Sequence, residues 1–111
     1  MTNKSIILED FIPKRIMQLR IQRGVSAREM SIALGQNPGY INNIETGKSF
    51  PKLAPLNYIC DYFGITLGQF FDVENNAPDQ LNKLMPKLKR LDSSQIAALE
   101  GIIDNYFEKE N

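Results

Sequence analysis

Two short capped helices in close succession, between Ser26 and Lys48, constrain the fold of this chain more than any other feature. Ser26 and Glu29 have the spacing of a capping box, in which each side chain satisfies the other residue's free backbone N–H. A helix should therefore begin near Ala27. Gly35, which can adopt a left-handed conformation, should end this helix after about two turns.

A second helix should start directly after this turn. Asn37 is a good N-cap, and Pro38 suits the first helical position, because its fixed φ fits a helix and its missing N–H is not needed there. We expect the helix to run to Gly47, with Ile41 and Ile44 on its buried face. The two asparagines between these isoleucines then point away from the core.

The rest of the chain also predicts helices, so we expect an all-α fold. Apolar spacing, caps and stop glycines favour helices near residues 10–23 and 53–63, and a short one after the Thr66–Gln69 capping box. Pro13 is tolerated in the first turn of the first of these helices. The expected core positions are Ile12, Ile16, Leu19, Met30, Ala33 and Leu34 (with Ile32 beside them), Ile41, Ile44, Leu56, Ile59, Cys60, Phe63, Leu67, Phe70 and Phe71.

We divide the chain into a five-helix domain over residues 1–74 and a helical extension over residues 75–111, which starts with a linker at 75–78. In the extension, Pro86 should kink or divide the first helix. Asp92 and Gln95 then form another capping box, which should start the last helix. The chain length of 111 residues leaves no room for a second large domain.

Composition excludes several classes of protein. The chain has no histidine, no metal-ligand spacing and no phosphate-binding glycine-rich loop, so we expect no catalysis, no metal and no cofactor. Cys60 is the only cysteine; this excludes an intramolecular disulfide, and its apolar setting favours a packing role over redox sensing. No segment is typical of a signal peptide or a membrane span, so a cytoplasmic protein is expected.

Charge is balanced overall but unevenly distributed. Thirteen basic and thirteen acidic residues cancel, yet the stretch from Lys14 to Lys52 holds seven basic and only two acidic residues. The stretch from Asp61 to Asp79 holds four acidic residues and no basic one. The basic stretch could neutralise phosphate, although these charges could instead only solvate helix faces.

The region around the two short helices resembles the helix-turn-helix of the lambda-repressor/Cro (XRE) family. The resemblance is carried by Ser31, Gly35, Ile41, Ile44 and the closing sequence Glu45-Thr46-Gly47-Lys48. It extends over roughly residues 12–72, to Arg20 before the motif and to FPKLAPLNYICDYFGITLGQFFD after it. It implies a five-helix lambda-repressor-like DNA-binding domain, in which the small side chain of Ser31 lets the two helices pack closely.

The resemblance implies binding to double-stranded DNA and places a base-contacting polar side chain at Asn43, whereas the phosphate candidates are chosen by charge and placement. Asn43 is the first candidate for reading a base, because an amide matches the donor and acceptor of an adenine edge, and Asn42 is the second. Asn37 caps its helix and could hold a phosphate with neighbouring N–H groups, while Gly39 allows close backbone approach. The phosphate candidates are Lys14, Arg28 and Lys48. Ordinary solvent exposure is the alternative for the asparagines.

Glu45 would repel phosphate unless it were neutralised. The family pairs this glutamate with an arginine of the first helix, and the matching residue here is Arg20. The resemblance therefore implies an Arg20–Glu45 ion pair that ties the two helices together.

The chain also departs from the family pattern. Pro38 and Gly39 stand at the first positions of the recognition helix, where neither side chain can hydrogen-bond a base edge. Ala27 replaces a glutamine that the family often uses near a phosphate. An alternative hypothesis is therefore a protein-interaction module, or an antitoxin-like partner, that retains the fold.

The last helix carries an apolar stripe that needs a partner surface. Ile96, Leu99, Ile103 and Phe107 are our candidates for a homodimer interface, and folding back onto the chain's own domain is the alternative. The resemblance implies a sequence-specific transcriptional regulator, with repression expected, that binds a two-half-site operator as a homodimer. The operator, any small-molecule effector and any protein partner are beyond the sequence.

Overall fold

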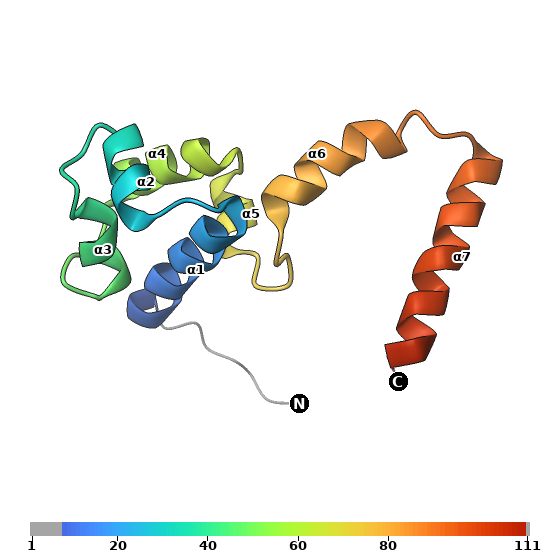
Figure 1. Cartoon of the computed structure of the whole chain (residues 1–111), viewed down its shortest axis with the longest axis horizontal. Helices are drawn as coiled ribbons and strands as arrows, with labels where there is room; N and C mark the ends of the chain where they lie inside the picture. Colours follow the sequence, from blue (N-terminus) through green and yellow to red (C-terminus); the bar gives the residue numbers. More distant parts are fainter. Residues whose placement is uncertain (1–7, 111) are drawn as a thin grey trace. The chain divides into compact units, whose positions relative to one another are not determined.

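The computed structural model describes residues 8–110, and these residues form seven helices and no strand, which confirms the all-α fold (Figure 1). The helices are, in chain order, α1 (Leu8–Arg23), α2 (Ala27–Ala33), α3 (Tyr40–Glu45), α4 (Leu53–Phe63), α5 (Leu67–Phe71), α6 (Pro78–Leu88) and α7 (Ser93–Glu110). The chain divides into two compact units, of which the first ends at Asp79 and the second begins at Gln80. Within residues 8–110, no helix is both long enough and apolar enough to cross a bilayer.

Three helices begin at the capping boxes that the sequence predicts. The Ser26 hydroxyl accepts a hydrogen bond from the Glu29 N–H, and the Glu29 carboxylate accepts one from the Ser26 N–H. Thr66 and Gln69 form the same pair of bonds before α5. Asp92 and Gln95 form them before α7. These boxes set where three helices start without any long-range contact.

The start of α3 differs from the sequence prediction. Asn37 is not its N-cap, because the helix begins at Tyr40 with Gly39 in the capping position. The Asn37 side chain instead accepts the N–H of Gly39, and the Asn37 carbonyl accepts the N–H of Tyr40. An asparagine that bonds its own neighbouring backbone competes with helix formation, and glycine is a poor helix former. A separate turn over 37–40 therefore precedes the helix.

Both helix-internal prolines are accommodated within continuous helices. The first helix starts at Leu8, two residues before the expected start, so Pro13 lies in its second turn. Of the two outcomes expected at Pro86, a kink or a division of the helix, the structure excludes the division, since α6 runs through Pro86 to Leu88. Pro86 is exposed, so water can replace the hydrogen bond that a proline cannot donate. Pro78, placed in the linker by the sequence, is buried as the first residue of α6.

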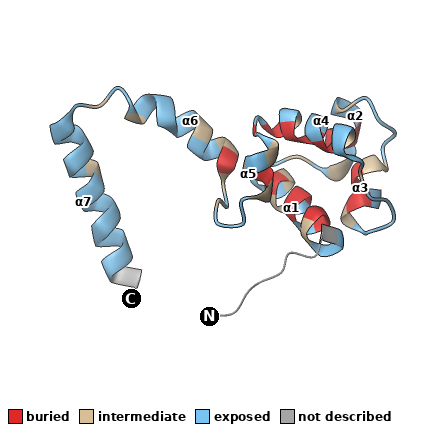
Figure 2. Ribbon diagram, turned by 180° about the vertical axis from the view of Figure 1, so that it is seen from behind, coloured by how far each residue is buried: buried red, intermediate tan, exposed pale blue. Residues whose placement is uncertain are grey.

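The core lies entirely in the first unit and is built mainly from the expected residues (Figure 2). Ile32 and Ala33, expected among the apolar positions, are exposed, and Ser31 is buried instead. Cys60 is fully buried, and burial raises the pKa of its thiol to about 11, so the thiol stays protonated near neutral pH. The buried apolar residues are Ile12, Ile16, Leu19, Met30, Ile41, Ile44, Leu56, Ile59, Cys60, Phe63, Ile65 and Phe70.

One charged side chain is buried with this core. Arg15 is 4% exposed as a residue, and its guanidinium donates to the backbone carbonyl oxygens of Phe70 at 2.7 Å and Gln69 at 2.8 Å. It also donates to the carbonyl oxygens of Asp72 at 3.2 Å and Asn75 at 2.8 Å. Burial lowers the pKa of Arg15, and the Asp72 carboxylate opposes this shift. Arg15 thus closes the C-terminal end of α5 against α1.

Replacing Arg15 with methionine should destabilise the first unit by about 3 kcal/mol, because it leaves buried carbonyl groups without a donor. Urea unfolding followed by circular dichroism measures this change. Arg28→Met, at an exposed position of α2, is the matched control and should change the free energy of unfolding by less than about 0.5 kcal/mol. Equal effects of the two substitutions would contradict the structural role of Arg15.

Candidate nucleic-acid interface

The turn between α2 and α3 depends on a glycine. Gly35 has φ +74°, a left-handed conformation that other L-residues rarely adopt. The Gly35 N–H donates to the carbonyl of Ile32 at 2.9 Å, and the Gln36 N–H donates to that of Ser31 at 3.0 Å. This pair of bonds ends α2 and turns the chain toward α3.

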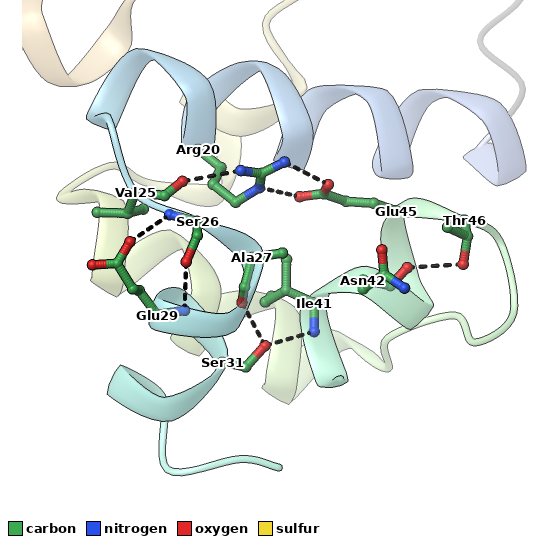
Figure 3. A network of polar contacts seen from close by, with 10 residues as sticks. All are labelled: Arg20, Val25, Ser26, Ala27, Glu29, Ser31, Ile41, Asn42, Glu45 and Thr46. Carbon is green, nitrogen blue, oxygen red and sulfur yellow. Dashed lines mark hydrogen bonds and ion pairs between the residues drawn. The ribbon is translucent and has the colours of Figure 1, made fainter. Parts of the chain in front are cut away.

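Ser31 joins the two helices through its hydroxyl group. The hydroxyl, fully buried, donates to the carbonyl of Ala27 at 2.7 Å and accepts the backbone N–H of Ile41 at 2.9 Å (Figure 3). The sequence assigned Ser31 only a role in close packing. The hydroxyl also satisfies a buried N–H in the first turn of α3, so it fixes how α3 meets α2.

Arg20 and Glu45 form the ion pair that the family resemblance implied. Arg20 Nε lies 2.7 Å from Glu45 Oε2, and Arg20 Nη2 lies 3.0 Å from Glu45 Oε1 (Figure 3). The Glu45 side chain is only 3% exposed, and its hydrogen bond raises the pKa of Arg20. Arg20 Nη1 also donates to the carbonyl of Val25 at 2.9 Å. A single guanidinium thus links α1, the α1–α2 connection and the end of α3.

The outer face of α3 is polar and uncharged. Ile41 and Ile44 are buried, whereas Asn42, Asn43 and Thr46 are exposed. The Thr46 hydroxyl donates to the backbone carbonyl of Asn42 at 2.8 Å, which closes the last turn (Figure 3). Two adjacent amides are therefore held at the surface by a helix whose other face is anchored.

Some of the other candidate residues gather at the start of α3. A Cβ atom added to Gly39 would lie 3.7 Å from Asn37 Oδ1 and 3.9 Å from Asn43 Nδ2, so these three residues are neighbours. Lys48 follows α3, and its N–H donates to the carbonyl of Asn43 at 2.8 Å. Arg28 lies on α2 and Lys14 on α1, and the side chains of Lys14, Arg28 and Lys48 are exposed.

Fewer basic side chains are free for phosphate than the charge count suggested. Arg15 and Arg20 bind within the fold, as described above. Arg23 donates to the carbonyl of Tyr62 at 3.0 Å, lies 5.0 Å above the centre of that ring, and stands 3.9 Å from Asp79 Oδ2. The exposed basic residues left in the stretch are Lys14, Arg28, Lys48 and Lys52.

The role of Arg15 was missed in the sequence, although a signal was present. Arg15 stands three residues after Ile12 and four before Leu19, so helical spacing places it on the buried face of α1. A charged residue on such a face must find partners in the fold. Its partners lie in residues 69–75, and no local pattern reveals them.

These features define a helix-turn-helix protein. The second helix of the motif, α3, has one buried face and one polar face that is exposed to solvent. Residues 14–76, more than half of the chain, match the helix-turn-helix domain family, and the chain belongs to that family. A search of curated proteins found no match.

Two solved structures are similar in fold. Both are described as the clp gene regulator ClgR from Corynebacterium glutamicum. One has a TM-score of 0.56 at 22% identity, covering 78% of this chain and 92% of that one. The other has a TM-score of 0.53 at 22% identity, covering 62% of this chain and 88% of that one. At this identity the likeness concerns the fold.

Removing only one partner of the Arg20–Glu45 pair should cost more than removing both. Arg20→Met leaves a nearly buried carboxylate without its cation, and we expect a loss of about 3–5 kcal/mol in the free energy of unfolding. The double variant Arg20→Met/Glu45→Met should lose less, because no unpaired charge remains. Urea unfolding of both single variants and the double variant measures the coupling. If the losses in the two single variants add up to the loss in the double variant, the ion pair contributes nothing to the free energy of unfolding.

Proposed function

We propose that this chain is a sequence-specific DNA-binding transcription regulator that acts as a repressor. The observation that carries the proposal is the arrangement of α3, which exposes two adjacent asparagines while its other face is buried. The Ser31 hydroxyl and the Arg20–Glu45 pair hold the helix in place. A recognition helix needs such support, because base contacts require side chains positioned on a rigid scaffold.

The exposed residues suit the two kinds of contact that a DNA-binding protein makes. Asn43 and Asn42 carry amides that can donate and accept at a base edge, which favours adenine. Gly39, which has no side chain, allows the backbone to approach the DNA closely. Lys14, Arg28 and Lys48 are assigned to phosphates, where they set position rather than sequence. Asn37 supports the turn before α3 and is assigned to the rim of the interface.

The second unit supports the proposal of a dimer on a two-half-site operator. Its last helix exposes an apolar stripe, in which Ile103 is 46% and Phe107 60% exposed. A two-fold dimer would present two copies of α3 to half-sites about 34 Å apart, or a multiple of this distance. Competition with polymerase at a promoter would then repress transcription. Both similar structures are of one protein, ClgR, described as a gene regulator, and this supports regulation as the role.

A protein-interaction module is the second candidate. Pro38 and Gly39 precede α3 and offer no side-chain donor to a base edge. Three of the seven basic residues in the 14–52 stretch bind within the fold, which weakens the electrostatic case for DNA. Selection of bound duplexes from a random DNA pool separates these two candidate functions.

Selection of bound duplexes from a random DNA pool at near-physiological salt should enrich a two-fold-related sequence. Asn42→Ala/Asn43→Ala should lose that enrichment, because truncation removes both amides from the base edges. The matched control is Asn57→Ala/Asn105→Ala, which removes two exposed asparagines from α4 and α7 and should preserve the enrichment.

A folded protein that enriches no sequence would favour the protein-interaction module. Salt dependence adds an independent check on phosphate contacts. Three phosphate contacts per copy predict a slope of log K against log salt of about −3 per copy. The triple variant Lys14→Ala/Arg28→Ala/Lys48→Ala should flatten that slope.

The dimer interface has its own test. Leu99→Asp/Ile103→Asp places charges on the apolar stripe of α7 and should convert the dimer to a monomer in sedimentation experiments on the full chain. Ser94→Asp/Asn105→Asp adds the same charges on the opposite face of α7 and should leave the dimer intact. A dimer that survives the first pair of substitutions would exclude this stripe as the interface.

A further inference from the structure

The second unit is divided into two segments of opposite charge. The segment from Gln80 to Leu91 has no acidic residue, and the segment from Asp92 to Glu108 has no basic residue. α6, which carries Asp79 in its first turn, is therefore basic from Gln80 onward, as is the turn after it, while α7 is acidic over residues 93–108. The charged residues are Lys83, Lys87, Lys89 and Arg90 in the first segment and Asp92, Glu100, Asp104 and Glu108 in the second.

Both helices also carry exposed apolar rows. On α6, Leu81, Leu84 and Met85 are 45%, 44% and 45% exposed, and Leu88 continues the same face. On α7, the stripe described above is exposed in the same way. No residue between 80 and 108 is buried (Figure 2). Helices of this length gain most of their stability by packing an apolar face, so both rows need a cover.

The acidic charges of α7 follow the edge of its apolar stripe. Glu100, Asp104 and Glu108 are four residues apart, and this spacing makes them one row along the helix. The row runs beside the face that contains Ile96 and Ile103. Charges that flank an apolar seam contribute little affinity but select which helix can pack there and in which orientation.

On α6, Lys83 and Lys87 have the same four-residue spacing and are exposed, and Lys89 follows the helix. An α6–α6 or α7–α7 contact would bring like charges together at the interface. Contact between an α6 and an α7 is the arrangement in which opposite charges meet.

We propose that the second unit is a dimerisation element in which basic α6 of one copy packs against acidic α7 of a second copy. This inference rests on the homodimer in the proposed function and specifies which helices face each other. A two-fold axis repeats each contact, so the α6–α7 pair occurs twice in the dimer. Each pair buries the two apolar rows and sets the basic row opposite the acidic row.

The same charges could also pair α6 with α7 of one chain. Two charge-reversed full-length variants separate these arrangements. The first, Lys83→Glu/Lys87→Glu/Lys89→Glu, makes both helices acidic. The second, Glu100→Lys/Asp104→Lys/Glu108→Lys, makes both basic. All six positions are exposed, so the substitutions leave the core of the first unit unchanged.

Each reversed variant alone should dimerise about tenfold or more weakly than the native chain, because like charges then face each other. An equimolar mixture of the two should form heterodimers, since every α6–α7 contact between the two different chains is again between opposite charges. Native mass spectrometry identifies the heterodimer, and sedimentation equilibrium measures its dissociation constant. A chain that carries all six reversals should dimerise like the native chain and shows that the substitutions permit folding.

As a control, replacing the same three lysines with glutamine removes their charge without reversing it. This should weaken the dimer less than replacing them with glutamate. Variants that dimerise as tightly as the native chain would overturn the proposal, because charge would then not select the partner helix. A mixture that stays monomeric while the six-reversal chain dimerises would also overturn it. A monomeric native chain would remove the homodimer itself, whereas DNA selection by the same chain reports separately on the DNA-binding proposal.

Discussion

The hydrogen bonds of the buried Arg15 guanidinium hold the two ends of the first unit together. They connect α1 to carbonyl groups in residues 69–75 and so join the start of the domain to its end. The carbonyls at the end of a helix need donors, and here one buried cation supplies several of them. The exit of the chain toward α6 therefore depends on a side chain in the second turn of α1.

The position of α3 depends on two further polar contacts made from neighbouring helices. Ser31 reaches its first turn from α2, and Arg20 reaches its last residue from α1. Each contact satisfies a buried polar group. Leaving such a group without a partner would lower the stability of the fold by an amount on the order of 1–3 kcal/mol. A helix of six residues has little stability of its own, so these contacts and two buried isoleucines hold its exposed face in place.

The second unit follows a different principle. Residues 80–108 have exposed apolar rows and segregated charges, and none of them is buried. The first unit satisfies its polar groups within one chain, whereas our proposal gives the second unit a partner in another copy. Stability and DNA recognition would then be properties of the first unit, and the spacing of two recognition helices would be a property of the dimer.

The sequence by itself determined the features that depend on near neighbours. These are the capping boxes at Ser26, Thr66 and Asp92, the turn at Gly35 and most of the core, because helix caps and helical faces follow from spacings of three and four residues. Resemblance to a family added the Arg20–Glu45 pair and the helix that carries the candidate asparagines. The DNA contacts themselves stay predictions. Only the tertiary structure decided which distant groups meet: the partners of Arg15 and the N–H that binds the Ser31 hydroxyl. A polar side chain can bond many carbonyls or amides equally well, and the fold selects which of them comes within reach.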